Sequence, residues 1–137
     1  MEHKTICTYT SGMQFDIDIN NHHFFVDANA ENGGNNTGPS PKPLLLASLA
    51  GCTAMDIVSL LNKMHVLFTN FNVETIAPLT EEHPKVYASM QLNYHINLAE
   101  IDKPKMEKAV GLSIEKYCGV YAMLSKAIDV KHTIVYH

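Results

Sequence analysis

The feature that most constrains the fold is a long apolar stretch with helical spacing, LLLASLAGCTAMDIVSLL, at residues 44–61. Apolar residues recur here at intervals of four and three, the spacing of one helix face: Leu45, Leu49, Cys52 and Met55. Further apolar residues widen this surface, so little of the helix is expected to face water. The pattern predicts a helix over about residues 43–64, roughly 30 Å long, at the centre of the core.

Short β-rich runs surround this helix. Three strands are expected before it, at residues 4–10, 13–19 and 22–28, and the second, MQFDIDI, alternates apolar with polar residues as if one face were buried. The Gly- and Asn-rich segment 31–43 is expected to be a mobile loop. Strands are expected later at 70–79, 84–96 and 129–137, with helices at 102–117 and 118–127. The order βββ–α–ββ–αα–β indicates an α+β fold.

Length and charge narrow the class of protein. The 137 residues suit one domain spanning 1–137. A net charge of −4 favours neither a nucleic-acid partner nor an anionic membrane. Ser48, Asp56 and Ser59 make the long helix too polar for a membrane span. No secretory signal is visible in MEHKTICTYT, so a cytoplasmic location is expected. The helix carries more apolar surface than one small sheet can cover, which predicts a homodimer.

Three cysteines are the candidate reactive residues. Cys7 falls on a strand and is expected to be structural, and Cys52 alone would be a small buried hydrophobe. Cys118 falls at the start of a helix, where the dipole favours a thiolate, so both a reactive and a structural role remain open for it. There is no CxxC pair and no zinc-ligand spacing, and His22 and His23 are adjacent on a strand and point to opposite faces. No metal and no cofactor are therefore expected.

Two segments resemble the cysteine segments of a known family. GPSPKPLLLASLAGCTAMDIVSLL, from Gly38, and LSIEKYCGVYAMLSKAIDVKH, from Leu112, are similar to those of the OsmC/Ohr family, the osmotically inducible and organic hydroperoxide resistance proteins, and closest to its YhfA-like branch. The resemblance covers nearly the whole chain. It implies an OsmC-like α+β domain that intertwines with a second copy, with active sites at the dimer interface where Cys52 and Cys118 approach each other.

The resemblance also implies a chemistry, a peroxidase reaction of the oxidative stress response. In active members the first cysteine, here Cys52, reduces an organic hydroperoxide and becomes a sulfenic acid. The second, here Cys118, condenses with it to a disulfide, which a dithiol reductant then reduces. The chain departs from the family because it has no arginine to activate the thiol, and because Lys42-Pro43 stands where a glutamate is expected.

Three residues are candidates to support the cysteines. Lys42 could supply a positive charge, Glu115 could replace the missing acid, and Asp56 lies one helical turn after Cys52. Each also has a structural alternative, as a solvated or locally bonded side chain. The sequence leaves three functions open: a thiol-dependent peroxidase with altered activation, a redox sensor, and a protein that binds a small apolar ligand.

Overall fold

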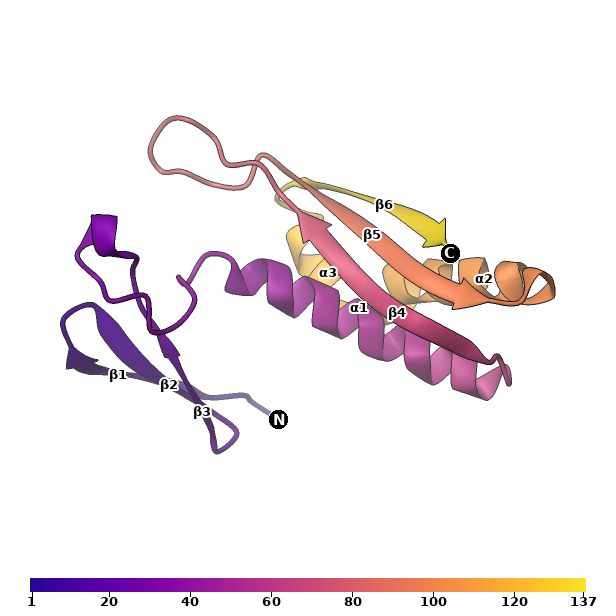
Figure 1. Ribbon diagram of the computed structural model, residues 1–137, viewed down its shortest axis with the longest axis horizontal. Coiled ribbons are helices and arrows are strands. Elements are labelled where there is room, and N and C mark those ends of the chain that lie inside the picture. Colours follow the sequence, from indigo (N-terminus) through magenta and orange to yellow (C-terminus); the bar gives the residue numbers. More distant parts are fainter. The chain divides into compact units, whose positions relative to one another are not determined.

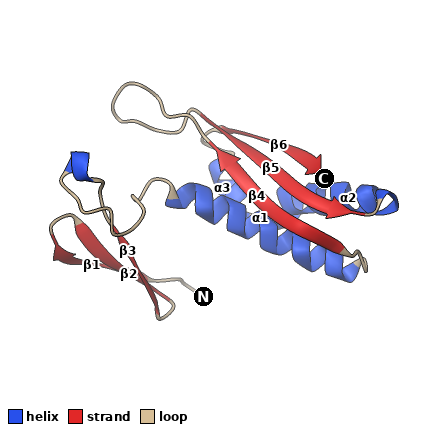
Figure 2. Cartoon of the chain, viewed as in Figure 1, coloured by secondary structure: helices blue, strands red, loops and turns tan.

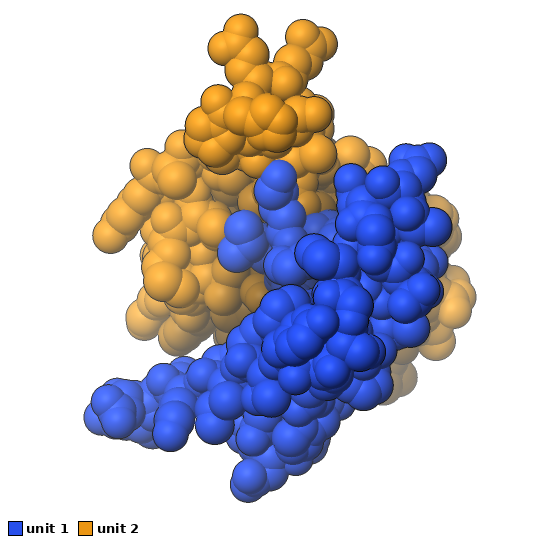
Figure 3. Space-filling model, turned by 90° about the vertical axis from the view of Figure 1, so that its left-hand side faces the viewer, with its two compact units in different colours: residues 1–45 blue, residues 46–137 orange.

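The computed structural model describes residues 1–137 and divides them into two compact units. The first unit is Met1–Leu45 and the second is Leu46–His137, coloured separately in Figure 3. The mixed helices and strands confirm the expected α+β class. A single domain over residues 1–137 and an intertwined homodimer stay predictions.

The first unit is a three-stranded antiparallel sheet in the order β1-β2-β3, formed by Thr5–Ser11, Gln14–Ile19 and His22–Val26. It confirms the three expected strands. Asn20 and Asn21 join the last two strands, and their φ angles of 51° and 63° are those that a tight two-residue hairpin turn requires. Figure 2 shows these strands in red, followed by the short 3₁₀ turn Ala30–Asn32.

One face of this sheet is apolar but only partly covered. Cross-strand pairing places Cys7 beside Ile17 and Tyr9 beside Phe15, and paired residues lie on the same face. Phe15 and Ile17 are half-buried, while Tyr9 is 60% exposed. The expectation of a buried face on MQFDIDI is therefore wrong for one chain, because nothing in the unit supplies the opposing layer.

The Gly- and Asn-rich segment after β3 is organised around the buried carboxylate of Asp27. Its Oδ1 accepts a hydrogen bond from the N–H of Ala28, and its Oδ2 accepts from the N–H of Asn35 and from the N–H and Oγ1 of Thr37. These bonds lower the pKa of Asp27, the Thr37 hydroxyl contributing most. A Cβ at Gly34 would lie 2.0 Å from the Ala28 carbonyl oxygen, so only glycine fits there.

The second unit is a sheet in the order β4-β5-β6 with helices packed on one face (Figure 1). β4 and β5 are antiparallel, whereas β5 and β6 are parallel and are joined by a helical crossover. Alternate residues of β5 are buried in the same core as residues of α1 and α2. The elements are α1 Leu44–Lys63, β4 Phe68–Ile76, β5 Ser89–Leu98, α2 Lys103–Leu112, α3 Gly119–Leu124 and β6 Asp129–Tyr136.

Two boundaries differ from the expected ones. Residues 77–88 form a connection between β4 and β5 rather than parts of both strands. Pro78 and Pro84, which lack an N–H to donate, fall in this connection. α2 ends at Leu112 and is followed by one turn of π-helix, Ser113–Tyr117, where an unbroken helix to Tyr117 was expected.

The buried stripe of α1 is rotated from the expected one. It consists of residues spaced by four: Leu49, Thr53, Ile57 and Leu61. Leu45 is 47% exposed and Met55 is 77% exposed, so the expectation that little of this helix faces water is wrong within one chain. By length and composition alone α1 could cross a membrane, contrary to the polarity argument. Core helices of soluble proteins share this length and composition.

Candidate functional site: a cluster of two cysteines and an aspartate

The fold of the second unit brings Cys52, Asp56 and Cys118 together. Cys52 and Asp56 lie one turn apart on the same side of α1, and Cys118 is the N-cap residue of α3. The two Sγ atoms and a carboxylate oxygen of Asp56 all lie within 4.8 Å of one another. Both thiols are free, Cys52 half-buried and Cys118 buried. A small movement of the side chains would bring the sulfurs to the bonding distance of about 2 Å in a disulfide.

The π-turn determines where Cys118 lies. The Cys118 N–H donates to the Ser113 carbonyl oxygen at 2.7 Å, a bond that spans five residues rather than four. This extra residue ends the helix, and Cys118 becomes extended with φ −77° and ψ 99°. The next helix starts at Gly119, and the Tyr121 N–H donates to Cys118 Sγ at 3.3 Å. The π-turn therefore fixes the second cysteine at a break between two helices.

Burial decides the protonation of Cys118. Loss of solvent raises the pKa of the Cys118 thiol to about 11, and the bond from the Tyr121 N–H opposes this rise only in part. A hydrogen bond with Cys52 and the charges of Cys52 and Asp56 raise the pKa further. Cys118 does lie at a helix start, as expected, but desolvation raises the pKa of its thiol more than the Tyr121 N–H lowers it.

A buried chain of hydroxyl groups connects the cluster to the sheet. Ser113 Oγ donates to Asp56 Oδ2 at 2.9 Å. The same Oγ lies 2.8 Å from Thr53 Oγ1, which lies 2.9 Å from the hydroxyl of Tyr94 on β5. Thr53, Ser113 and Tyr94 are fully buried, and burial raises the pKa of Tyr94 to about 12. These hydrogen-bonded hydroxyl groups hold the Asp56 carboxylate in one orientation.

Sequence reasoning missed Thr53, Ser113 and Tyr94. A signal for Thr53 existed, because it is the polar residue in the four-spaced stripe that also contains Leu49 and Ile57. Ser113 had no such signal, since its position depends on the π-turn.

The structure places the other expected site residues in different surroundings. Asp56 is part of the cluster. Glu115 is exposed on the π-turn, and Lys42 is exposed at the end of the first unit; neither forms an ion pair or a side-chain hydrogen bond. Cys7 is exposed on β1 of the first unit. The supporting roles of Lys42, Glu115 and Asp56 stay predictions.

A small cavity of about 150 Å³ adjoins the cluster and shares Asp56 with it. It is also lined by Ser59, Leu60, Lys63 and Tyr117.

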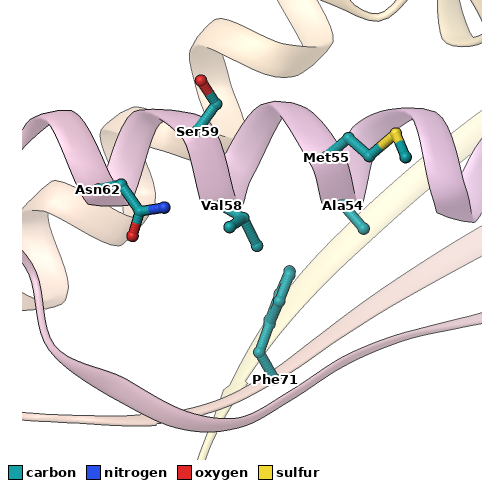
Figure 4. Close-up of a pocket in the computed structure, with 6 residues that line it drawn as sticks. All are labelled: Ala54, Met55, Val58, Ser59, Asn62 and Phe71. Carbon is teal, nitrogen blue, oxygen red and sulfur yellow. The ribbon is translucent and has the colours of Figure 1, made fainter.

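A larger, mainly apolar groove of about 550 Å³ lies between α1 and β4. Figure 4 shows Phe71 of β4 pointing toward Val58, with Met55 and Asn62 on the same stretch of α1. The lining residues are Ala54, Met55, Val58, Ser59, Asn62 and Phe71. This groove contains neither cysteine of the cluster.

The fold and the paired cysteines define an OsmC-like protein. The family model described as OsmC-like protein matches residues 33–133, which include Cys52 and Cys118. The chain belongs to this family.

Individual relatives agree with this assignment. Protein YhfA of Escherichia coli (strain K12) is 30% identical over 112 residues, covering 82% of this chain and 81% of that protein. A hypothetical protein from Aquifex aeolicus VF5 has a crystal structure that superposes with a TM-score of 0.82 at 23% identity, covering 100% of this chain and 98% of the other. An organic hydroperoxide resistance protein OsmC from Legionella pneumophila superposes with a TM-score of 0.66 at 17% identity, covering 96% of each chain.

Proposed function

We propose that this OsmC-like protein is a thiol-dependent peroxidase that reduces organic hydroperoxides through Cys52 and Cys118. The observation that carries the proposal is the approach of the two sulfurs to within 4.8 Å, although they come from different helices. The Legionella pneumophila relative, described as an organic hydroperoxide resistance protein and predicted redox protein, supports the same chemistry.

The proposed reaction balances with a hydroperoxide and a dithiol. The Cys52 thiolate attacks the outer oxygen of the hydroperoxide, the O–O bond breaks, and an alcohol leaves after taking a proton. The resulting sulfenic acid on Cys52 is attacked by the Cys118 sulfur, which forms the disulfide and releases water. A dithiol then reduces the disulfide and is itself oxidised.

The burial of Cys118 suits the resolving role. Its raised pKa keeps it a thiol until Cys52 has been oxidised, so it does not compete for peroxide. When it attacks the sulfenic acid, its proton can leave with the departing hydroxyl group as water.

Activation of Cys52 must come from groups other than arginine. Lys42 is the candidate from the sequence. A nearby ammonium group lowers the pKa of a thiol because it stabilises the thiolate.

The pH dependence of Cys52 alkylation tests Lys42. If its ammonium group acts on the thiol, the alkylation midpoint of Lys42→Met rises above that of the wild type, while the midpoint of Lys108→Met, changed at an exposed position of α2, does not move. Coincident curves for all three proteins would make Lys42 a surface residue only.

Consumption of cumene hydroperoxide in the presence of dithiothreitol tests the function. We expect catalytic turnover by the wild type and by Cys7→Ser, and loss of turnover in Cys52→Ser. Mass spectrometry after one equivalent of peroxide should recover a Cys52–Cys118 disulfide. A disulfide without turnover would replace the peroxidase by a redox sensor, and the absence of both would leave a non-enzymatic ligand-binding protein.

We also infer that the protein is a cytoplasmic homodimer. The partly covered sheet face of the first unit and the exposed side of α1 support a second copy as partner. A cytoplasmic location fits a pair of thiols that must be returned to the reduced state.

A further inference from the structure

We propose that Cys52, Asp56 and Cys118 bind a zinc ion, with two sulfur ligands, one carboxylate oxygen and a fourth position left for water. The sequence predicts no metal because Cys52 and Cys118 are far apart along the chain and neither belongs to a CxxC pair. The fold supplies the proximity that sequence spacing lacks.

The geometry of the cluster is close to what zinc requires. A tetrahedral zinc ion with Zn–S bonds of about 2.3 Å separates two sulfur ligands by roughly 3.8 Å. The three ligand atoms here all lie within 4.8 Å of one another, so small side-chain rotations complete the arrangement. Cys52 and Asp56 form an i, i+4 pair on the rigid helix α1, and Cys118 comes from a second helix start.

The carboxylate is held as metal-ligating carboxylates are held in proteins. Asp56 Oδ2 accepts from Ser113 Oγ at 2.9 Å, and Ser113 is fixed in turn by the buried Thr53. Such outer hydrogen bonds orient a ligand and raise the affinity of a metal site. The carbonyl oxygen of Ser113 also accepts a hydrogen bond from the backbone N–H of Cys118. Ser113 therefore contacts both Asp56 and Cys118, two of the three ligand residues.

A cation would also balance the charge of the cluster once its thiols have ionised. Asp56 is half-buried, and its hydrogen-bond partner is a serine rather than a lysine or histidine. With both thiols deprotonated the three groups would carry three negative charges, of which a divalent cation neutralises two. Binding replaces the two thiol protons by one Zn²⁺, so it releases two protons to solvent.

The ligand types select zinc among common divalent cations. Calcium and magnesium bind oxygen ligands, whereas thiolates favour zinc and other softer metals. The cavity that shares Asp56 has room for water, which would occupy the fourth position. The same two sulfurs form the disulfide in the proposed peroxidase reaction, so zinc binding and disulfide formation exclude each other. Zinc would thereby protect the reduced pair from oxidation.

Cobalt substitution tests the site directly, because tetrahedral Co²⁺ bound to thiolates gives an intense sulfur-to-metal charge-transfer band and strong visible absorption. The reduced full-length protein, freed of metal by a chelator, is titrated with Co²⁺ and the cobalt is then displaced by Zn²⁺. We expect one Co²⁺ per chain, loss of the charge-transfer band in both Cys52→Ser and Cys118→Ser, and an unchanged titration in Cys7→Ser.

Two variants distinguish a metal site that depends on Asp56 and Ser113 from metal binding by the two thiols alone. Asp56→Asn keeps the size of the side chain and is expected to weaken Zn²⁺ binding by at least about tenfold, and Ser113→Ala by about tenfold. Circular dichroism is used to check that each variant is folded. In the wild type, Zn²⁺ should also slow alkylation of the half-buried Cys52 but not of the exposed Cys7, which gives a readout independent of the variants.

The outcomes separate this inference from the peroxidase proposal. An affinity that is unchanged in Asp56→Asn, a band that survives in Cys52→Ser, or alkylation that Zn²⁺ leaves unchanged would overturn the zinc site. Peroxide turnover is measured on the metal-free protein in the same preparation. Turnover without zinc binding would refute only the proposed zinc site, and zinc binding without turnover would refute only the proposed peroxidase activity.

Discussion

At the scale of single residues, the two cysteines of the cluster differ in their surroundings. Cys52 is half-buried on α1, beside Asp56, whereas Cys118 is buried and its pKa is raised to about 11. Only a group with access to solvent can meet an external peroxide as a thiolate. The difference in burial therefore supports attack by Cys52 and resolution by Cys118.

The Cys118→Ser variant tests this order of events. Without a resolving thiol, the sulfenic acid on Cys52 should persist after one equivalent of cumene hydroperoxide and be trapped by a 1,3-dione. The wild type should give the disulfide and little adduct. An adduct that forms mainly on Cys118, when Cys52→Ser is treated in the same way, would reverse the two roles.

Thr53→Val tests the buried hydroxyl chain. The substitution keeps the shape of the side chain but leaves the buried Tyr94 hydroxyl without its partner, while Ser113 Oγ keeps its hydrogen bond to Asp56. We expect a loss of about 1–3 kcal/mol in the free energy of unfolding, measured with urea. Thr69→Val, at an exposed position of β4, should change it by less than about 0.5 kcal/mol. Equal effects of Thr53→Val and Thr69→Val would show that the buried hydroxyl groups do not stabilise the fold.

At the scale of elements, the sequence patterns found every strand and α-helix but not how the site is built. Alternation and helical spacing report which residues share a face, so the order βββ–α–ββ–αα–β is confirmed. The π-turn Ser113–Tyr117 depends on one carbonyl bonding five residues ahead, and no residue type signals it. The rotation of α1 that buries Thr53 rather than Cys52 depends on packing against β5 and α2, which involves distant parts of the chain.

The segment around Asp27 gives a pH prediction for the first unit. The folded pKa of Asp27 is lowered from its ordinary value of 3.8, so the folded state favours the carboxylate. Its contribution to stability is complete above pH 3.8 and is lost as the pH falls through the lower folded pKa.

Asp27→Asn measures that contribution. The variant should be less stable than the wild type at pH 7, because an amide cannot accept all the bonds that the carboxylate accepts. The difference should shrink as the pH falls below 3.8, where the wild type also becomes protonated. The difference in the free energy of unfolding between the two proteins is measured by circular dichroism during urea unfolding at several pH values. A difference that stays constant down to pH 2 would assign the effect to packing instead of charge.

At the scale of the whole molecule, apolar surface remains exposed in each unit taken by itself. Large side chains on the first sheet are 36–60% exposed: Ile6, Tyr9, Ile19, Phe24 and Phe25. On α1, Met55 lies beside an apolar groove of about 550 Å³ and is 77% exposed. Exposed patches of this kind mark interfaces in soluble proteins.

We expect the protein to sediment as a dimer at micromolar concentration. Met55→Glu places a charge in the exposed apolar groove of α1 and should shift the protein toward the monomer or reduce its stability. Lys108→Glu, at an exposed position of α2, should leave the sedimentation unchanged. A folded wild-type monomer would refute the dimer, and a dimer unaffected by Met55→Glu would place the interface elsewhere.

The row of hydroxyls between Tyr94 and Asp56 has a direction. Each hydroxyl group has one proton and can donate one hydrogen bond, and Ser113 donates its hydrogen bond to Asp56. Ser113 must then accept from Thr53, and Thr53 from Tyr94, so every O–H in the row points from the sheet toward the carboxylate. Protonation of Asp56 would allow the row to reverse and would leave the Tyr94 proton without an acceptor in the core. The charge on one half-buried carboxylate is in this way transmitted to the central strand of the sheet.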